Sequence, residues 1–263
     1  MENYPDTIQI GDVKKVSYKD GILYTENGNF NIGHVDMLIG GSPCQDFSIA
    51  HTMCSVHDSE KYGLKGDKSK LFYEYLRIKQ ETNPTVFFLE NVRMKKDSEK
   101  QLNEYLGVEG IHIDSSTFTY QHRRRIYWTN IKDVSIPEDK NVDFQDYKDT
   151  DYEYCKQFKV KPTKSRLQMW NNGETYTSST LRHCQNVTNM SKIGTVTRKQ
   201  DRCPNSGLIE FEDFCRYLTR KELEQAQTLP IGYTDCLSYN QACDVIGDCW
   251  TVDVIKYIFS FMF

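Results

Sequence analysis

The chain has 263 residues, a net charge of −4, 38% hydrophobic and 27% charged residues, which excludes a disordered or collagen-like protein and suits one large domain with a smaller appendage. Its nine cysteines include no Cys-x-x-Cys pair, which argues against a metal site and for reduced thiols. No stretch approaches the ~18 apolar residues of a membrane span, and no secretory signal is visible at the start. We therefore expect a cytoplasmic protein with no metal and no membrane contact.

Two buried strands joined by a helix are predicted in the first third of the chain. Residues 35–40 form a short apolar run that ends in Gly-Gly-Ser-Pro, which is typical of a buried strand followed by a turn. The apolar stripe of residues 69–80 predicts a helix, and Asn83-Pro84 ends it before a second apolar run at 85–89. A strand–helix–strand unit of this kind predicts a parallel pair and an α/β fold.

Further elements are predicted on either side of this unit. The alternating segments 116–120 and 126–130 predict two strands that meet at a turn near His122. Thr219 and Glu222 have the spacing of a capping box, which predicts a helix that Pro230 ends. The remaining expected elements are a strand near 8–10, a helix at 97–106 and a last amphipathic helix at 252–261.

The small net charge hides two segments of opposite sign. Residues 132–154 carry eight acidic and three basic residues, whereas residues 156–202 carry ten basic and two acidic ones. The second segment also contains Trp170 and Tyr176 and has few apolar runs. A basic stretch with interspersed aromatic residues is what contact with nucleic-acid phosphates requires. From charge alone, a solvated loop that confers solubility is an equally good interpretation.

The ends of the two predicted strands carry residues that could do chemistry. Cys44 follows the first strand and Glu90 follows the second, so both are expected in one crevice at the carboxyl edge of the sheet. A thiolate beside an acid suits covalent attack on an electron-poor ring that the acid holds or protonates. Each residue alone has an ordinary interpretation, since free cysteines usually pack as small hydrophobes. The pairing of the two favours a functional site.

Residues 121–125 place several cations on a short segment. In an extended chain Gln121, Arg123 and Arg125 would share one face, because alternate side chains point the same way. Arginine forks suit carboxylates, phosphates and base carbonyl groups. An exposed basic turn is the competing interpretation of this segment.

Taken in order, these motifs resemble those of the DNA cytosine-5 methyltransferases, and they look closest to the phage and bacterial members. The resemblance runs through nearly the whole chain. The similar motifs lie at residues 11–13 (GDV), 41–45 (GSPCQ), 88–92 (FLENV), 121–125 (QHRRR), 216–234 and 246–250 (IGDCW). Asp248 stands where many members of the family carry asparagine.

The resemblance implies a mechanism. Cytosine would rotate out of the duplex, because chemistry on a stacked base is sterically blocked. The Cys44 thiolate would add to C6, Glu90 would bond the N3 edge and the exocyclic amine, and C5 would take a methyl group from S-adenosylmethionine. Arg123 and Arg125 would help to hold the base and the loop that carries Cys44. The other eight cysteines are assigned to packing.

The resemblance also implies binding residues and a domain plan. The expected cofactor-binding residues are Asp12, Val13, Pro43, Asp248 and Trp250. The expected contacts with double-stranded DNA come from Gln45, Gln121, Lys159, Lys161, Lys164 and Arg166. The expected plan is a catalytic domain at 1–149, a target recognition domain at 150–207 and a segment at 208–263 that returns to the catalytic domain.

One departure from the family concerns the start of the chain. The family begins with a Phe-x-Gly-x-Gly motif on its first strand and an acid after its second, and no Gly-x-Gly occurs near the start here. We therefore expect a Rossmann-like methyltransferase sheet that lacks its N-terminal strands. Such a chain could be a truncated enzyme, a degenerate copy, or one half of a split enzyme whose companion polypeptide carries the missing motif.

The expected function is methylation of C5 of cytosine in DNA, with S-adenosylmethionine as methyl donor. Two alternatives stay open at this point. One branch with the same motifs acts on tRNA. If this chain belongs to that branch, a labelled methyl donor offered with both nucleic acids should label RNA rather than DNA. An inactive DNA-binding remnant would bind DNA and form no covalent adduct with 5-fluorocytosine.

Overall fold

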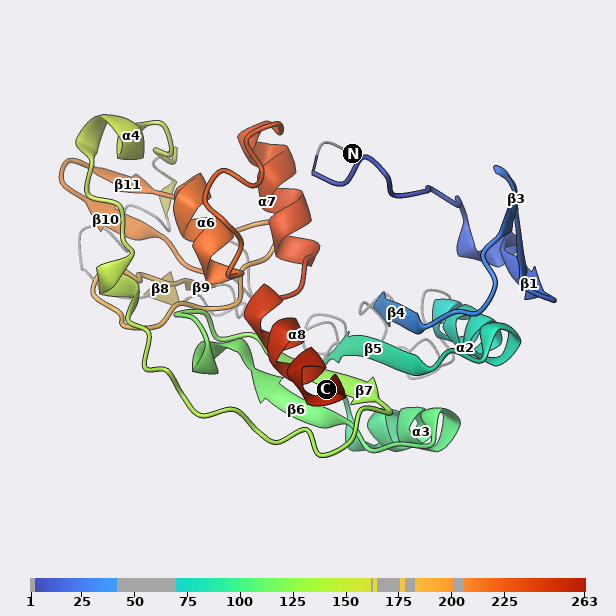
Figure 1. The fold of residues 1–263 in the computed structure, drawn as a ribbon. Helices are drawn as coiled ribbons and strands as arrows, with labels where there is room; N and C mark the ends of the chain where they lie inside the picture. Colours follow the sequence, from blue (N-terminus) through green and yellow to red (C-terminus); the bar gives the residue numbers. More distant parts are fainter. Residues whose placement is uncertain (1–2, 42–69, 162, 165–175, 178–182, 201–205) are drawn as a thin grey trace. The chain divides into compact units, whose positions relative to one another are not determined.

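The computed structural model describes residues 3–41, 70–161, 163–164, 176–177, 183–200 and 206–263 (Figure 1). The chain divides into two compact units. The first contains Met1–Ile113, Arg124–Ile136 and Phe261–Phe263, and the second contains Asp114–Arg123 and Pro137–Ser260. Residues 208–260 therefore belong to the same compact unit as residues 137–207. The expected domain plan instead assigned residues 208–263 to the catalytic domain. The functional boundaries 1–149, 150–207 and 208–263 stay a prediction.

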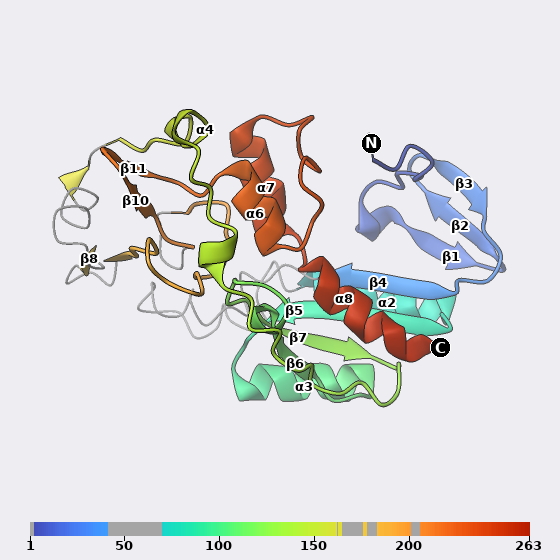
Figure 2. The same ribbon diagram turned by 60° about the vertical axis from the view of Figure 1, so that its left-hand side comes forward.

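The first unit contains a four-stranded mixed sheet with the strand order β4-β5-β7-β6 (Figures 1 and 2). Its strands are β4 (Met37–Gly41), β5 (Val86–Val92), β6 (Ile111–Asp114) and β7 (Arg124–Thr129). β4 runs parallel to β5, with Gly41 opposite Glu90, and β7 runs antiparallel to β5. Helix α2 (Lys70–Thr82) lies between β4 and β5 in the sequence. The predicted parallel strand pair is confirmed.

Helix α2 and helix α3 (Lys96–Leu106) pack on one face of this sheet (Figure 1). Alternate residues of β5 and β7 point toward the helices, because successive side chains of a strand face opposite sides. The buried residues of this layer are Phe72, Tyr75, Leu76, Leu102 and Leu106 from the helices and Phe87, Leu89, Ile126 and Trp128 from the strands. Glu90 and Arg125 occupy the other parity of the same strands, so they lie on the opposite face.

The close packing of α2 on β4 depends on a glycine. A Cβ on Gly40 would lie 2.8 Å from the ring of Tyr75, a separation that real side chains do not tolerate. The Tyr75 hydroxyl then reaches across to donate a hydrogen bond to the carbonyl oxygen of Phe88 at 3.0 Å. Gly40 therefore lets the helix lie close enough to bond the neighbouring strand.

The N-terminal part of the first unit differs from the prediction of a strand at 8–10. A 3-10 helix, η1 (Val13–Lys15), precedes a separate three-stranded antiparallel sheet. Its strands are β1 (Ser17–Lys19), β2 (Ile22–Thr25) and β3 (Gly28–Asn31). Asp20 and Gly21 both have positive φ angles, 51° and 81°, as a tight hairpin turn between β1 and β2 requires. This Asp-Gly pair is a local hairpin signal that the prediction for this part of the chain did not use.

The strand predicted at 116–120 is also wrong, whereas the partner predicted at 126–130 is confirmed as β7. Residues Ser115–Thr117 form a 3-10 helix, η4, directly after β6. The Asp114 carboxylate accepts hydrogen bonds from the backbone N–H groups of Ser116 (3.1 Å) and Arg123 (2.9 Å). Aspartate and serine side chains favour such local bonds over a strand ladder, and they close the chain into a turn here.

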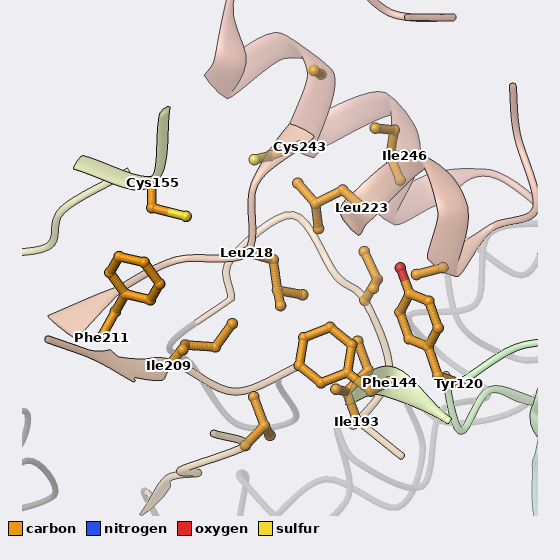
Figure 3. Packing of buried hydrophobic residues seen from close by; sticks show 14 of the residues in the cluster. Tyr120, Phe144, Cys155, Ile193, Ile209, Phe211, Leu218, Leu223, Cys243 and Ile246 are labelled. Atoms are coloured by element: carbon orange, nitrogen blue, oxygen red, sulfur yellow. The ribbon is translucent and has the colours of Figure 1, made fainter. Parts of the chain in front are cut away.

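The second unit surrounds its own apolar cluster, shown in Figure 3. Tyr120, Phe144, Ile209, Leu218 and Ile246 are among its buried members. Besides η4, the helical elements of this unit among the described residues are η5 (Phe144–Asp146), α4 (Tyr152–Lys156), α6 (Arg220–Ala226), α7 (Tyr239–Asp248) and α8 (Val252–Phe259), and η6 (Ser260–Met262) begins at its edge. The strands are the pairs β8 (Tyr176–Thr177) with β9 (His183–Cys184) and β10 (Ile209–Phe211) with β11 (Phe214–Arg216).

The predicted capping box at the start of α6 is confirmed. The Thr219 side chain accepts from the Glu222 backbone N–H, and the Glu222 carboxylate accepts from the Thr219 N–H. The helix ends at Ala226 rather than at Pro230, because Thr228 takes a left-handed conformation with φ of 53°. Among the described residues, no helix is long and apolar enough to cross a membrane.

Candidate active site

Glu90 and Arg125 form an ion pair on the face of the sheet opposite α2 and α3. Arg125 Nε lies 2.9 Å from Glu90 Oε1, and the two side chains are only 13% and 11% exposed. Glu90 belongs to β5 and Arg125 to β7, two adjacent strands in which Glu90 is opposite Tyr127. A mostly buried ion pair is weakly screened by water, so the guanidinium orients the carboxylate strongly. A carboxyl group held in this way can bond the polar edge of a heterocyclic ring.

The predicted nucleophile follows β4 in the sequence. Pro43, Cys44 and Gln45 lie outside the described residues, as does Arg166. The last residue of β4 is Gly41, which pairs with Glu90 in the parallel register. The chain therefore enters the segment that carries Cys44 beside the carboxylate of the ion pair. That the two groups share a crevice stays a prediction.

The buried Cys155, Cys215 and Cys243 and the half-buried Cys249 fit the packing role assigned to them, whereas Cys236 is exposed. Burial raises the pKa of the Cys155 thiol to about 11, and it likewise raises the pKa of Cys249 to about 11. Arg123 opposes the effect at Cys249 without reversing it. A thiol with such a pKa stays protonated at neutral pH and is a poor nucleophile.

Gln121 was predicted to contact DNA, and the structure corrects this expectation. The residue is 0% exposed. Its Nε2 donates to the carbonyl oxygen of Ala226 at 2.8 Å, and its Oε1 accepts from the N–H of Val196 at 2.8 Å. A fully buried side chain whose donor and acceptor both hold the backbone cannot reach DNA. Gln121 instead ties three segments of the second unit together.

Arg123 was predicted to be catalytic, and its surroundings favour a positioning role instead. It is 4% exposed, and its terminal nitrogens donate to the carbonyl oxygens of Val196 (3.0 Å), Gly247 (3.2 Å) and Cys249 (2.8 Å). The alternation of residues 121–125 predicted one shared face. The structure divides them, because Arg123 bonds within the second unit while Arg125 bonds Glu90 within the first.

The expected cofactor-binding residues lie in both units. In the first, the exposed Asp12 carboxylate accepts from the Lys14 N–H at 3.0 Å, and Val13 follows it in η1. In the second, Asp248 is exposed and forms an ion pair with Arg198, and Trp250 is half-buried. An exposed carboxylate and a partly exposed indole face suit the polar edge and the ring face of an adenine. Binding of the adenosine half of S-adenosylmethionine by these residues stays a prediction.

The expected DNA-binding lysines are on the surface of the second unit. Lys159, Lys161 and Lys164 are all exposed, whereas Phe158 and Val160 are buried. This alternation indicates an extended segment that turns its apolar residues inward and two of its lysines outward. The Nζ of Lys159 also lies 5.5 Å from the ring centroid of Phe214, within cation–π range. Contact of these lysines with DNA phosphates stays a prediction.

Sequence analysis missed two groups of residues that shape these sites. One is the buried ion pair of Arg216 and Glu222, for which the capping box at Thr219 was the nearest signal. The other is Gln227, a buried amide just after α6 that bonds the carbonyl oxygens of Ile246, near the end of α7, and of Cys249, directly after it. No sequence pattern singles out this glutamine, because the groups that it bonds are remote in the sequence.

The mixed sheet with helices packed on it and a carboxylate at a strand end defines an α/β protein of the Rossmann-like methyltransferase class. Two solved structures support this fold assignment at 14% sequence identity each. The methyltransferase EhMeth of Entamoeba histolytica has a TM-score of 0.64 over 100% of this chain and 86% of its own. The Dnmt2 methyltransferase of S. pombe has a TM-score of 0.59 over 86% of this chain and 77% of its own.

The chain belongs to the C-5 cytosine-specific DNA methylase family, whose sequence model matches residues 1–263. Enzymes of this family take their methyl group from S-adenosylmethionine. Similar curated proteins include the orphan methyltransferase M.SPRI of Bacillus phage SPR, 29% identical over 55% of this chain, and the type II methyltransferase M.AquIA of Picosynechococcus, 33% identical over 52%. The matched region spans 31% of M.SPRI and 52% of M.AquIA.

Proposed function

We propose that this chain methylates C5 of cytosine in double-stranded DNA, and that the Glu90–Arg125 ion pair is the observation that carries the proposal. It holds a mostly buried carboxylate at a strand end, opposite the last residue of the strand that leads to Cys44. A nucleophile and an acid at neighbouring strand ends can act on the two sides of one pyrimidine ring. S-Adenosylmethionine supplies the methyl group when it is bound.

Cys44, Glu90 and Arg125 have separate roles in the proposed reaction. The Cys44 sulfur forms a bond to C6, and the electron pair of the C5–C6 double bond moves into the ring. The Glu90 carboxyl group, protonated for this step, donates its proton to N3 and accepts a hydrogen bond from the exocyclic amine, which stabilises the negative charge that develops in the ring. Arg125 keeps the Glu90 carboxylate in place. After C5 gains its methyl group, it loses its proton to a base, the sulfur–C6 bond breaks, and the aromatic ring is restored.

A covalent trap tests this proposal. Duplex DNA that contains 5-fluorocytosine should stall on the enzyme in the presence of the methyl donor, because fluorine cannot leave C5 as a proton does. We expect a DNA–protein adduct that survives denaturing electrophoresis. Binding without an adduct would indicate an inactive DNA-binding remnant, and transfer of label to tRNA instead of DNA would indicate an RNA methyltransferase.

The basic segment is proposed to contact the DNA backbone. Replacing Lys159, Lys161 and Lys164 together by glutamine should weaken DNA binding and lower the slope of log affinity against log salt by up to about one unit per lost phosphate contact. The measurement is a fluorescence-anisotropy titration at several salt concentrations. Glutamine at the exposed lysines Lys95, Lys96 and Lys100 is the matched control. An unchanged slope in the first variant would mean that the segment does not face DNA.

The free edge of β4 supports a further strand beside it. β4 pairs only with β5 among the described residues, and Ile39 on it is 49% exposed. An edge strand offers a row of unpaired backbone groups, and an exposed isoleucine adds apolar surface. We propose that a segment on a companion polypeptide, with a strand and a Phe-x-Gly-x-Gly turn, pairs with this edge and completes the cofactor site.

Supplying such a segment tests the companion proposal. A peptide or fused segment that carries the strand, the glycine turn and a second strand ending in an acid should raise both the melting temperature and methyl incorporation. Restored alignment of the sulfonium can change the rate on the order of a hundredfold, because a misplacement of about 1 Å costs that much. Ile39→Lys should abolish the gain, since it puts a charge on the paired edge. The proposal would be contradicted if the chain alone were fully active and if adding the segment left its melting temperature unchanged.

The site of action is proposed to be the cytoplasm of a bacterial or phage-infected cell. Similar proteins come from a Bacillus phage and from Neisseria gonorrhoeae, where the relative is a type II methyltransferase. DNA that is accessible to such an enzyme lies in the cytoplasm of these cells. A role beside a restriction enzyme follows as part of the same proposal, and protection of host DNA from cleavage would test it.

A further inference from the structure

Gln227, just after the last residue of α6, is fully buried and makes every hydrogen bond of which its side-chain amide is capable. Its Nε2 donates to the carbonyl oxygens of Ile246 (3.0 Å) and Cys249 (3.5 Å). Its Oε1 accepts from Thr251 Oγ1 (2.7 Å) and from Gln121 Nε2 (3.2 Å). An amide has two donor hydrogens and two acceptor lone pairs, so the partners fix its orientation completely.

The backbone beside this amide holds the start of α8. The Gln227 carbonyl oxygen accepts from the Val252 N–H at 3.0 Å, and Thr228 Oγ1 accepts from the Asp253 N–H at 2.9 Å. These bonds replace the side-chain cap that Thr251 does not provide. Thr228 has a φ of 53°, which a β-branched residue rarely adopts. Such strain persists where the surroundings impose it, and it clusters at functional sites.

A second buried side chain fixes the same segment. Arg123 donates to the carbonyl oxygens of Gly247 (3.2 Å) and Cys249 (2.8 Å). The segment also lies against a neighbouring loop, because a Cβ on Gly247 would be 2.5 Å from the backbone nitrogen of Arg198. The backbone of residues 246–251 is therefore set by side chains from remote parts of the chain. This segment carries two of the residues that fit the adenosine half of the cofactor.

We propose that Gln227 is a positioning residue of the cofactor site. Its amide sets the backbone of residues 246–251, and this backbone aims Trp250 and Asp248 at the adenosine half of S-adenosylmethionine. The inference rests on the proposed function and extends it to a residue that touches neither substrate. Because the same amide also bonds Gln121, it joins the cofactor segment to the strand connection that continues into Arg125.

Gln227→Met tests the inference, because methionine has a similar length and neither donates nor accepts at those positions. We expect the Kd of S-adenosylmethionine, measured by calorimetry, to rise about tenfold, equal to about 1.4 kcal/mol. The KM for S-adenosylmethionine should rise with it, while kcat at saturation and the Kd for DNA change little. Amide hydrogen exchange should accelerate in residues 246–253 and stay at the wild-type rate in β4, β5 and β7.

Gln225→Met is the matched control, since Gln225 lies on the same helix and its side chain makes no hydrogen bond within the described part of the chain. Unchanged cofactor affinity and unchanged exchange in Gln227→Met would overturn the inference, as would an equal loss of kcat, DNA affinity and exchange protection throughout. If Gln227→Met fails to fold, Thr251→Val removes one bond to the same amide and should show the same selective change. A wild-type preparation that methylates nothing would contradict the proposed function, whereas an active wild type with insensitive variants would contradict this inference alone.

Discussion

Cys44→Ser is expected to lower methyl transfer by at least about a thousandfold, because loss of a covalent nucleophile removes the reaction path itself. A serine hydroxyl is far less ionised than a thiol at neutral pH, so it cannot add to C6 at a useful rate. DNA binding should persist, since the change only replaces the sulfur atom with a smaller oxygen atom. The measurements are incorporation of labelled methyl groups and trapping on 5-fluorocytosine DNA, in the most active preparation of the protein.

Two variants make this prediction specific. Cys236→Ser alters an exposed cysteine and should leave the rate close to that of the wild type. Glu90→Gln keeps the shape of the acid and removes its charge, so it should slow the reaction while leaving Cys44 able to form some adduct. Methylation by Cys44→Ser at a comparable rate would show that another group is the nucleophile.

Glu222→Gln is expected to lower the free energy of unfolding by about 3–5 kcal/mol, because breaking a buried ion pair leaves an uncompensated charge in the core. Arg216 and Glu222 are both 0% exposed, and two guanidinium nitrogens lie 2.8 and 2.9 Å from the carboxylate oxygens. Burial works to lower the pKa of Arg216, but the hydrogen bonds and charge of Glu222 outweigh it and hold that pKa above its ordinary value. The guanidinium stays charged in the variant even without this partner, because arginine is not deprotonated in proteins.

The same carboxylate also accepts from the backbone N–H groups of Asp149 (2.8 Å) and Thr219 (2.7 Å). Glutamine would direct an N–H group at one of these donors, which adds to the loss. Chemical denaturation of the full chain measures the effect. Glu153→Gln is the control, because Glu153 is 79% exposed and its 3.8 Å pair with Lys156 should contribute well under 1 kcal/mol. Equal stability of the two variants would contradict the assigned role of the pair.

Much of the fold could be predicted because its signals are local. The apolar run that became β4 and the stripe of α2 report burial directly, and the capping box of Thr219 and Glu222 satisfies helix N–H groups within one turn. Glu90 was found for the same reason, since it directly follows the apolar run at 85–89, although it lies within β5. The strand predicted at 116–120 failed because Asp114 closes the chain into a turn there, a competing local bond that periodicity does not register.

The sequence by itself determined the fold class and the order of the motifs, since these depend on residues that are close together in the chain, and the pairing of Cys44 with Glu90 stays a prediction. Only the tertiary structure decided which partners the arginines of residues 121–125 bind. Arg125 pairs with Glu90, and Arg123 donates to three backbone carbonyl oxygens. It likewise decided that Gln227 meets Thr251. Such contacts join groups tens of residues apart, and a buried polar group takes whichever partner the packed core brings to it, because leaving it unsatisfied is costly.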